Sequence, residues 1–368
     1  MALIERVAMW LVDLKPMVTR SDAIQSFTSQ ETPIVRITDS DGTEGVGYTY
    51  TIGTGGTAIH ALLKDYLIPR LIGQESLMIE EIWKDLFFFT HATSVGAITS
   101  LSLAAIDTAL WDLKAKRSDL PLHQLAGGAQ SKVPLYTTEG GWLHLTVDEL
   151  IDDALAVKEQ GFGGSKIKVG RPIAEDAARL QAVKDAVGED FNIMIDANQG
   201  FTVDEAIRRA SYYADAGVAW YEEPLPAEDI QGHVRLAHST SLPIAIGESL
   251  YHPSHFREYM ARDACSIIQV DVARVGGITP WLKTAHTAEG FNLPVCPHFL
   301  MELHVALTAA VPNGKWVEYI PQLGPITQQE MKMSDGFAIP SMNPGLGILW
   351  DWNAITHHTI DGSYQEFT

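Results

Sequence analysis

The chain has 368 residues, of which 46% are hydrophobic, so it can bury a large core and its composition argues against intrinsic disorder. Its formal net charge of −20 argues against nucleic acid or an anionic membrane as a partner. Its two cysteines, Cys265 and Cys296, lie in apolar runs and are interpreted as buried hydrophobic residues of a reducing compartment. The first residues lack a signal-peptide pattern and no stretch is apolar enough to span a bilayer, so we expect a cytoplasmic protein.

The first 127 residues have the pattern of an α+β domain. Residues 32–39 and 45–50 alternate between apolar and polar around Asp41-Gly42, which predicts a hairpin. Helical patterns follow and end in residues 101–116. The tail, residues 325–368, has strand and turn character, and we expect it to return to this first domain.

Residues 128–324 alternate short apolar runs with helical patterns. Residues 133–136 predict the first strand, and Thr146-Val-Asp-Glu149 opens the first helix as a capping box. Eight such strands with helical connections predict a closed (β/α) barrel, with an open doubly wound sheet as the alternative. The later strands are expected near residues 167–169, 191–195, 218–221, 244–247, 267–270, 293–296 and 316–317.

Three carboxylates recur every 26 residues: Asp196, Glu222 and Glu248. Each follows a short apolar run, and a buried acid needs water, a proton, a partner or a metal. Because the carboxyl ends of the strands of a parallel barrel meet at one mouth, the three side chains are expected to converge there. Three carboxylates suit Mg²⁺, whereas the absence of His and Cys from this set argues against zinc.

Basic and acid/base residues are predicted at the same mouth. Lys166 and Lys168 lie two apart on one strand, so both would point inward. Asp271, His298 and Glu318 end the sixth, seventh and eighth strands. Asp271 beside His298 would make the imidazole a general acid/base, and Lys168 is expected to have a lowered pKa beside Lys166 and a metal. Two bases around a metal suit removal of a proton next to a carboxylate, through an enediolate.

Several motifs follow one another in a specific order along nearly the whole chain. They are Ala105-Ile-Asp-Thr-Ala-Leu-Trp-Asp-Leu-Lys114, Pro121-Leu-His-Gln-Leu-Ala-Gly-Gly128, Ser165-Lys-Ile-Lys-Val169, Ile195-Asp-Ala-Asn-Gln199, Tyr221-Glu-Glu-Pro224, Ile246-Gly-Glu248, Asp271-Val-Ala-Arg-Val-Gly-Gly-Ile278 and Pro297-His-Phe-Leu-Met-Glu302. In their order and spacing, the chain resembles the enolase superfamily, mandelate racemase subgroup. Stretches around 163–170, 273–277 and 297–304 are most similar to acid-sugar dehydratases that act on galactarate or talarate.

The resemblance implies a modified (β/α)₇β barrel under an N-terminal α+β capping domain completed by the C-terminal segment, usually in a homo-oligomer. It implies Mg²⁺ as cofactor and assigns roles to the residues already singled out. Those roles are Mg²⁺ ligation by Asp196, Glu222 and Glu248, one base at Lys168, the opposite base at the Asp271–His298 pair, and contacts to the substrate carboxylate from Lys166 and from protonated Glu318. Glu223 is expected beside the ligand set.

Loops of the capping domain near residues 16–30 and 51–58 are expected to close the mouth and to contact the substrate. Arg20 is a candidate partner for the distal carboxylate of a dicarboxylate, and Asn198 and Tyr48 are further candidate contacts. Tyr48 stands where the family's Gly-x-Gly-Glu pattern ends in Glu.

The leading hypothesis is a Mg²⁺-dependent enzyme that eliminates water from an acid sugar, either an aldarate or an aldonate, to give a 2-keto-3-deoxy acid. The same two bases could instead racemise or epimerise a 2-hydroxy acid. A noncatalytic acid-sugar-binding protein is the third reading.

Overall fold

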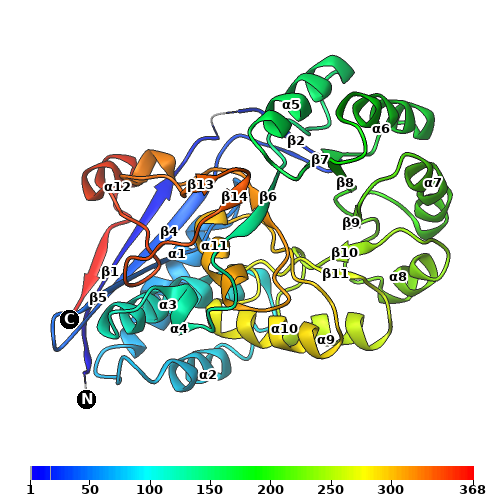
Figure 1. The fold of residues 1–368 in the computed structure, drawn as a ribbon. Coiled ribbons are helices and arrows are strands. Elements are labelled where there is room, and N and C mark those ends of the chain that lie inside the picture. The colour runs from blue at the N-terminus through cyan, green and yellow to red at the C-terminus, as the bar shows by residue number, and fades with distance from the viewer. Residues whose placement is uncertain (1, 17) are drawn as a thin grey trace.

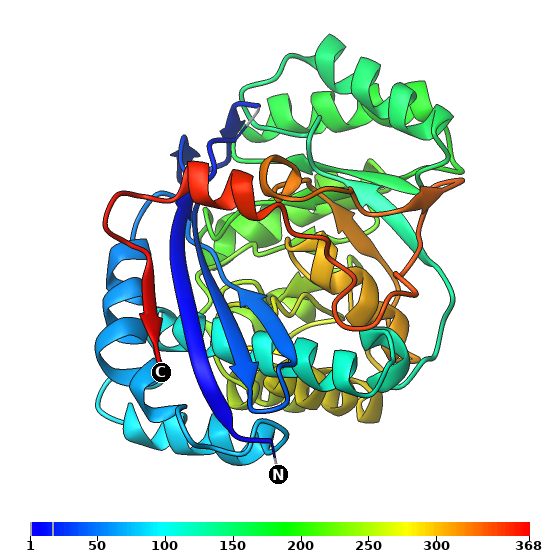
Figure 2. The ribbon, with the colours of Figure 1, turned by 90° about the vertical axis from the view of Figure 1, so that its left-hand side faces the viewer.

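The computed structural model describes residues 2–16 and 18–368, and its N-terminal part is an antiparallel sheet covered by helices (Figures 1 and 2). The strand order is β15-β1-β4-β5, and β4 and β5 form the predicted hairpin. The elements of this part are β1 (Ile4–Asp13), β2 (Arg20–Ser21), β3 (Ser26–Phe27), β4 (Glu31–Asp39), β5 (Glu44–Tyr48), α1 (Gly56–Leu62), a π-helical turn (Leu63–Leu67), a 3₁₀ turn (Ile68–Arg70), α2 (Ile79–Phe89), α3 (Ala97–Arg117) and α4 (Leu122–Leu125).

The long helix α3 lies directly against β5, and two glycines of that strand permit the close approach. A Cβ atom added at Gly47 would lie 2.3 Å from the backbone oxygen of Ala105, and one at Gly45 would lie 2.1 Å from that of Ala109. These distances are shorter than any real Cβ contact, so only glycine fits at both positions. The contact fixes the end of β5, from which a loop leads to the barrel mouth.

Eight strand positions close into a barrel of parallel strands. Named strands β6 to β11 lie side by side in chain order. Beyond β11, Ile268 bridges in parallel to Val295 and Val295 to Gly314, from which the chain enters β12. Strand β12 pairs in parallel with β6, so the circuit returns to its first strand. The barrel strands are β6 (Val133–Thr137), β7 (Gly164–Lys168), β8 (Asn192–Asp196), β9 (Tyr221–Glu222), β10 (Ile244–Ile246), β11 (Ile267–Ile268) and β12 (Val317–Tyr319).

Seven helices in the described part of the chain connect these strands, so the predicted modified (β/α)₇β barrel is confirmed and the open sheet is wrong. The capping box at Thr146 is present, with Thr146 Oγ1 accepting from Glu149 N and Glu149 accepting from Thr146 N. The connecting helices are α5 (Val147–Glu159), α6 (Ile173–Val187), α7 (Val203–Asp215), α8 (Ile230–Ala237), α9 (Pro253–Ala261), α10 (Ile278–Gly290) and α11 (Met301–Ala310).

The C-terminal tail divides its contacts between the two parts of the molecule. A 3₁₀ turn (Gly324–Ile326) leads to β13 (Met333–Ser334) and β14 (Phe337–Ala338), and β14 pairs with barrel strand β6. Helix α12 (Trp352–His358) and β15 (Gln365–Phe367) then lie on the capping side, where β15 extends the sheet beside β1 (Figure 2). Within the described residues, no helix is long and apolar enough to cross a bilayer.

Candidate active site

Three carboxylates converge at the carboxyl ends of neighbouring barrel strands. Asp196 ends β8 and Glu222 ends β9, and the parallel register places them side by side. Glu248 follows β10 after Gly247, whose φ of +145° and close contact with Gln269 exclude a side chain. One oxygen from each carboxylate lies within 4.8 Å of the other two, and all three residues are buried. The equal spacing in the sequence thus corresponds to one cluster in space.

The chemistry of this cluster fits a hard divalent cation. Burial, together with the neighbouring acids, raises the pKa of Glu222 to about 7. The Oε2 atom of Glu248 is buried and forms no hydrogen bond with the described residues, although it lies 3.2 Å from His298 Nε2. Buried carboxylates that crowd one another are stabilised by a cation, and an all-oxygen donor set is typical of Mg²⁺ sites.

Two further side chains orient Glu222, and the sequence analysis missed both. Its Oε2 accepts hydrogen bonds from Trp220 Nε1 at 3.0 Å and from Gln269 Nε2 at 2.7 Å. Trp220 lies two residues before Glu222 and Gln269 lies two before Asp271. Because residues two apart on a strand share a face, this spacing is the signal that could have identified them.

The two lysines of β7 point into the mouth and contact the carboxylates. Lys166 Nζ donates to Glu222 at 2.6 Å, and Lys168 Nζ donates to Asp196. Burial lowers the pKa of Lys168, but the surrounding carboxylates, with Asp196 foremost, raise it by more in sum. The protein's own side chains therefore do not lower the pKa of Lys168, because the contact with Asp196 outweighs the effect of Lys166. The lowered pKa expected beside a bound cation stays a prediction.

Asp271 and His298 form a hydrogen-bonded pair on neighbouring strands. His298 Nδ1 lies 2.8 Å from Asp271 Oδ2, and Tyr50 of the capping domain donates to the same oxygen at 2.7 Å. Burial raises the pKa of Asp271, but the hydrogen bond and charge of His298 and the nearby Arg274 lower it further, to about 2. Burial lowers the pKa of His298, whereas Glu248 and Asp271 raise it to a net value above normal. The imidazole is held with Nε2 toward Glu248.

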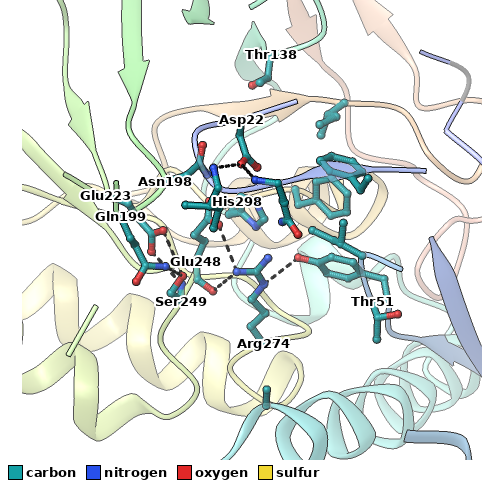
Figure 3. A pocket seen from close by; sticks show the side chains of 18 of the residues that line it. Asp22, Thr51, Thr138, Asn198, Gln199, Glu223, Glu248, Ser249, Arg274 and His298 are labelled. Carbon is teal, nitrogen blue, oxygen red and sulfur yellow. Dashed lines mark hydrogen bonds and ion pairs between the residues drawn. The ribbon is translucent and has the colours of Figure 1, made fainter. Parts of the chain in front are cut away.

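Tyr50 and Arg274 belong to this network and had no role in the sequence analysis. Arg274 Nε donates to Tyr50 Oη at 3.1 Å, and its Nη1 donates to the backbone oxygen of Glu248 at 3.0 Å (Figure 3). Tyr50 is 221 residues from Asp271 in the chain, so no local pattern could have paired them.

Glu318 ends β12 and is surrounded by hydrogen-bond donors. Its two oxygens accept from Thr138 Oγ1 and from Phe299 N, and Lys166 Nζ lies 3.0 Å away. Burial raises its pKa, but Lys166, His298 and these hydrogen bonds lower it further, to a net value well below normal. In the protein alone, donors on both oxygens thus favour the carboxylate, and the protonated form expected from the resemblance for the contact with a substrate carboxylate stays a prediction.

A cavity of about 510 Å³ opens above these groups, between the barrel mouth and the capping domain (Figure 3). Both capping loops expected at the mouth line it, through residues 22–27 and 51–55. The barrel contributes Lys166, Lys168, Glu248, His298 and Glu318, and Asn198 lines it as well. Asn198 Oδ1 is buried and has no hydrogen-bond partner among the described residues, so it is available to a ligand.

Arg20 and Tyr48, two candidate substrate contacts, do not line this cavity, so both assignments are wrong. The Arg20 guanidinium is 3% exposed, bonds to Glu139 and to the backbone oxygen of Pro321, and borders a different cavity. Tyr48 is buried against Trp350, with the rings edge to face at 5.6 Å. Both side chains are packed within the protein, away from the mouth.

Several loop residues at this mouth have unusual backbone conformations. Asn198, Gln199, Glu223 and Phe299 all have positive φ, between 36° and 63°. Non-glycine residues in this region carry strain that clusters at functional sites. Glu223 is buried behind Glu222, where it accepts hydrogen bonds from the amide and hydroxyl of Ser249.

Two family profiles match most of the chain. Residues 6–127 match the mandelate racemase / muconate lactonizing enzyme N-terminal domain, and residues 149–354 match the enolase C-terminal domain-like family.

Three relatives are similar over nearly their full length. L-talarate/galactarate dehydratase of Salmonella typhimurium is 36% identical over 90% of this chain and 85% of its own, and its structure with Mg and L-lyxarohydroxamate superposes with a TM-score of 0.95. L-talarate dehydratase of Polaromonas sp. JS666, in complex with Mg and L-glucarate, is 34% identical over 100% of this chain and 99% of its own, with a TM-score of 0.95. The 3,6-anhydro-alpha-L-galactonate cycloisomerase of Streptomyces coelicolor is 35% identical over 87% of this chain and 89% of its own.

Proposed function

Because the chain belongs to the mandelate racemase / muconate lactonizing enzyme family, we propose that it is a Mg²⁺-dependent acid-sugar dehydratase. It removes the proton next to a carboxylate and eliminates water to give a 2-keto-3-deoxy acid. The observation that carries the proposal is the placement of two bases around the carboxylate cluster. Lys168 contacts Asp196 at one end of the row, and His298 lies 3.2 Å from Glu248 at the other.

The proposed mechanism follows from this placement. Asp196, Glu222 and Glu248 would hold Mg²⁺, whose positive charge would stabilise the enediolate. Lys166 pairs with the substrate carboxylate, and Glu318 holds Lys166 in position. The configuration at the α-carbon decides whether Lys168 or His298 faces the α-proton. That base accepts the proton as the C–H bond breaks, and the electron pair of the bond stays on the substrate as the enediolate.

Departure of the hydroxyl completes the reaction. The enediolate electrons form the carbon–carbon double bond while the C–O bond to the β-hydroxyl breaks. His298, held through Nδ1 by Asp271, donates the proton that lets the hydroxyl leave as water. The resulting enol then becomes the 2-keto-3-deoxy acid. Asn198 is proposed to contact the substrate, since its side-chain oxygen faces the cavity without a partner.

The test uses acid sugars deuterated at the α-carbon with wild type, Lys168→Ala and His298→Asn. We expect wild type to lose deuterium and to form keto acid, and each variant to lose keto-acid formation by about 100-fold or more. Lys64→Ala and His286→Asn, both exposed, are matched controls that should retain full activity. Binding without deuterium loss from any acid sugar would instead support a noncatalytic binding protein.

Racemisation or epimerisation is the second candidate, because two bases at opposite ends of one cluster also suit transfer of a proton from one face to the other. In that case the α-carbon would exchange and invert without any keto acid. Appearance of the inverted acid as sole product would overturn the dehydratase proposal.

We also propose a cytoplasmic homo-oligomer. Phe88 and Phe89 at the end of α2 are 59% and 43% exposed and offer an apolar surface to a second copy. Light scattering after size-exclusion chromatography should give a multiple of the chain mass, and a monomer at micromolar concentration would contradict this.

A further inference from the structure

The cavity above the barrel mouth has two chemically different sides. Every cation that lines it among the described residues belongs to the barrel: Lys166, Lys168, Arg274 and His298. The capping side contributes instead Asp22, Ile24, Gln25, Phe27, Tyr50, Thr51, Ile52, Thr54, Gly55, Ala97, Ile98 and Leu101. The side that faces the far end of a bound substrate is therefore apolar or neutral, apart from one acid.

The barrel cations are already held at the reacting end. Lys166 and Lys168 contact the cluster carboxylates, and His298 is bonded to Asp271. Arg274 is fixed between Tyr50 and Glu248, where its Nη1 also lies 3.3 Å from Glu248 Oε1. In the proposed mechanism Lys166 pairs with the substrate carboxylate at the metal end and Lys168 acts as a base, so the described lining offers no further cation for a second carboxylate.

The one arginine of the first capping loop, Arg20, is turned away from the cavity. Its guanidinium is 3% exposed and bonded to Glu139 and the Pro321 oxygen. Lys15 borders the same separate cavity as Arg20. Arg20 cannot reach the mouth without breaking the contacts with Glu139 and Pro321 that hold it in the fold.

The single charged side chain on the capping side is the carboxylate of Asp22, which points into the cavity (Figure 3). Its Oδ1 accepts from the backbone amides of Ile24 and Gln25, each at 2.8 Å, so a turn fixes its position. Its second oxygen is in no hydrogen bond with the described residues, and a carboxylate oxygen can accept hydrogen bonds from sugar hydroxyls. Burial raises the pKa of Asp22 above its ordinary value, although the charge of Lys168 and the two backbone hydrogen bonds lower it in part. A second carboxylate placed there would be repelled by the ionised form of Asp22.

We infer that the substrate is an acid sugar with a single carboxylate, an aldonate whose far end is uncharged and whose hydroxyls bind Asp22. This inference rests on the proposed function and narrows its substrate class. A dicarboxylate would place its second charge beside the carboxylate of Asp22, and the described capping side has no cation to pair with it. Like charges that lie together without a cation between them repel each other. The inferred substrate thus has one carboxylate, whereas relatives of this chain are named for the dicarboxylates talarate and galactarate.

The direct test compares six-carbon aldonates with the aldarates of the same configuration, by keto-acid formation. We expect kcat/KM for the best aldonate to exceed that of its matched aldarate by about 100-fold or more, the usual effect of an uncompensated charge. An aldarate used as well as or better than its aldonate would overturn this inference and leave the dehydratase proposal standing. If neither class gives keto acid or loses α-deuterium, the proposed function itself is overturned.

Two variants test the capping side itself. Asp22→Asn keeps the oxygen that accepts from the turn amides but removes the charge, and should lower the aldonate preference about 10-fold. Ile24→Lys adds a cation at a lining position that is 61% exposed, and should raise aldarate turnover relative to aldonate by a similar factor. Asp361→Asn, on the exposed tail, is the control and should leave the ratio unchanged. An unchanged ratio in both Asp22→Asn and Ile24→Lys would overturn the inference.

Discussion

His304 offers a sharp test of how the fold supports the Asp271–His298 pair. It is fully buried on α11, and its Nδ1–H donates to the backbone oxygen of Phe299 at 3.0 Å. Its Nε2 accepts from the backbone amide of Val272 at 3.2 Å. These partners directly follow His298 and Asp271 in the chain, so the ring joins the two loops that carry the pair. The arrangement requires the neutral imidazole, because Nε2 must accept.

Burial lowers the pKa of His304 from 6.5 to about 4. Since the folded value lies below the unfolded one, the unfolded chain takes up the proton first as pH falls. The stability from this group is thus complete above about pH 6.5 and is lost toward pH 4. With these two pKa values, the free energy of unfolding falls by about 2 kcal/mol between pH 7 and pH 5.

The assay is urea unfolding of wild type and His304→Gln at pH 7 and pH 5. At pH 7 the variant should be less stable by about 1–3 kcal/mol, because a backbone group is left without its partner. The variant carries no titrating ring at this position, so its stability does not fall with this protonation. The difference in free energy of unfolding between the two proteins should therefore shrink by about 2 kcal/mol at pH 5. The exposed His286→Gln serves as control and should show no such change. If wild type and His304→Gln differ by the same free energy of unfolding at both pH values, His304 does not stabilise the fold as a neutral imidazole.

Three further outcomes are expected. Removal of divalent cations with EDTA should abolish keto-acid formation and lower the melting temperature, and Mg²⁺ but not NaCl of equal ionic strength should restore both; a melting temperature indifferent to Mg²⁺ would contradict the cation site. Tyr50→Phe deletes the hydrogen bond to Asp271 and should lower kcat about 10-fold, whereas Tyr66→Phe, at an exposed position, should not; equal kcat values would remove Tyr50 from the network. Gly277→Ala should destabilise the protein by about 2 kcal/mol or more in urea unfolding, because φ is +116° and a Cβ would lie 2.4 Å from the Asp107 carboxylate. Gly290→Ala, in open space at the end of α10, should instead be neutral or slightly stabilising, and a similar loss at both glycines would show that the strain argument fails.

The barrel and its carboxylate cluster could be predicted because their signals are local and periodic. Apolar runs of strand length alternate with helices that begin at residues such as Thr146, and the strand ends follow from that rhythm. In a parallel barrel all strand ends meet at one mouth, so Asp196, Glu222 and Glu248 had to converge once the strands were placed. The period of two along β7 likewise turned both Lys166 and Lys168 inward.

Protonation states were less predictable, because they depend on which groups come into contact. The sequence supplied Lys166 as a neighbour that lowers the pKa of Lys168, but not the closer contact with Asp196. It supplied Glu318 at a strand end, but not the donors on both of its oxygens. A pKa reflects the sum of short-range contacts in three dimensions, and a one-dimensional pattern fixes only some of them.

The sequence alone therefore determined the barrel, the hard-cation cluster and the two bases, because periodicity fixes which face of a strand each residue occupies. Only the tertiary structure decided what surrounds them. It turned Arg20 toward Glu139, brought Tyr50 to Asp271 and left Asp22 as the one charge on the capping side of the cavity. Those contacts join segments far apart in the chain, where loops rather than periodic elements set the direction of each side chain. The reacting end is thus encoded locally, and the end that selects the substrate emerges from packing.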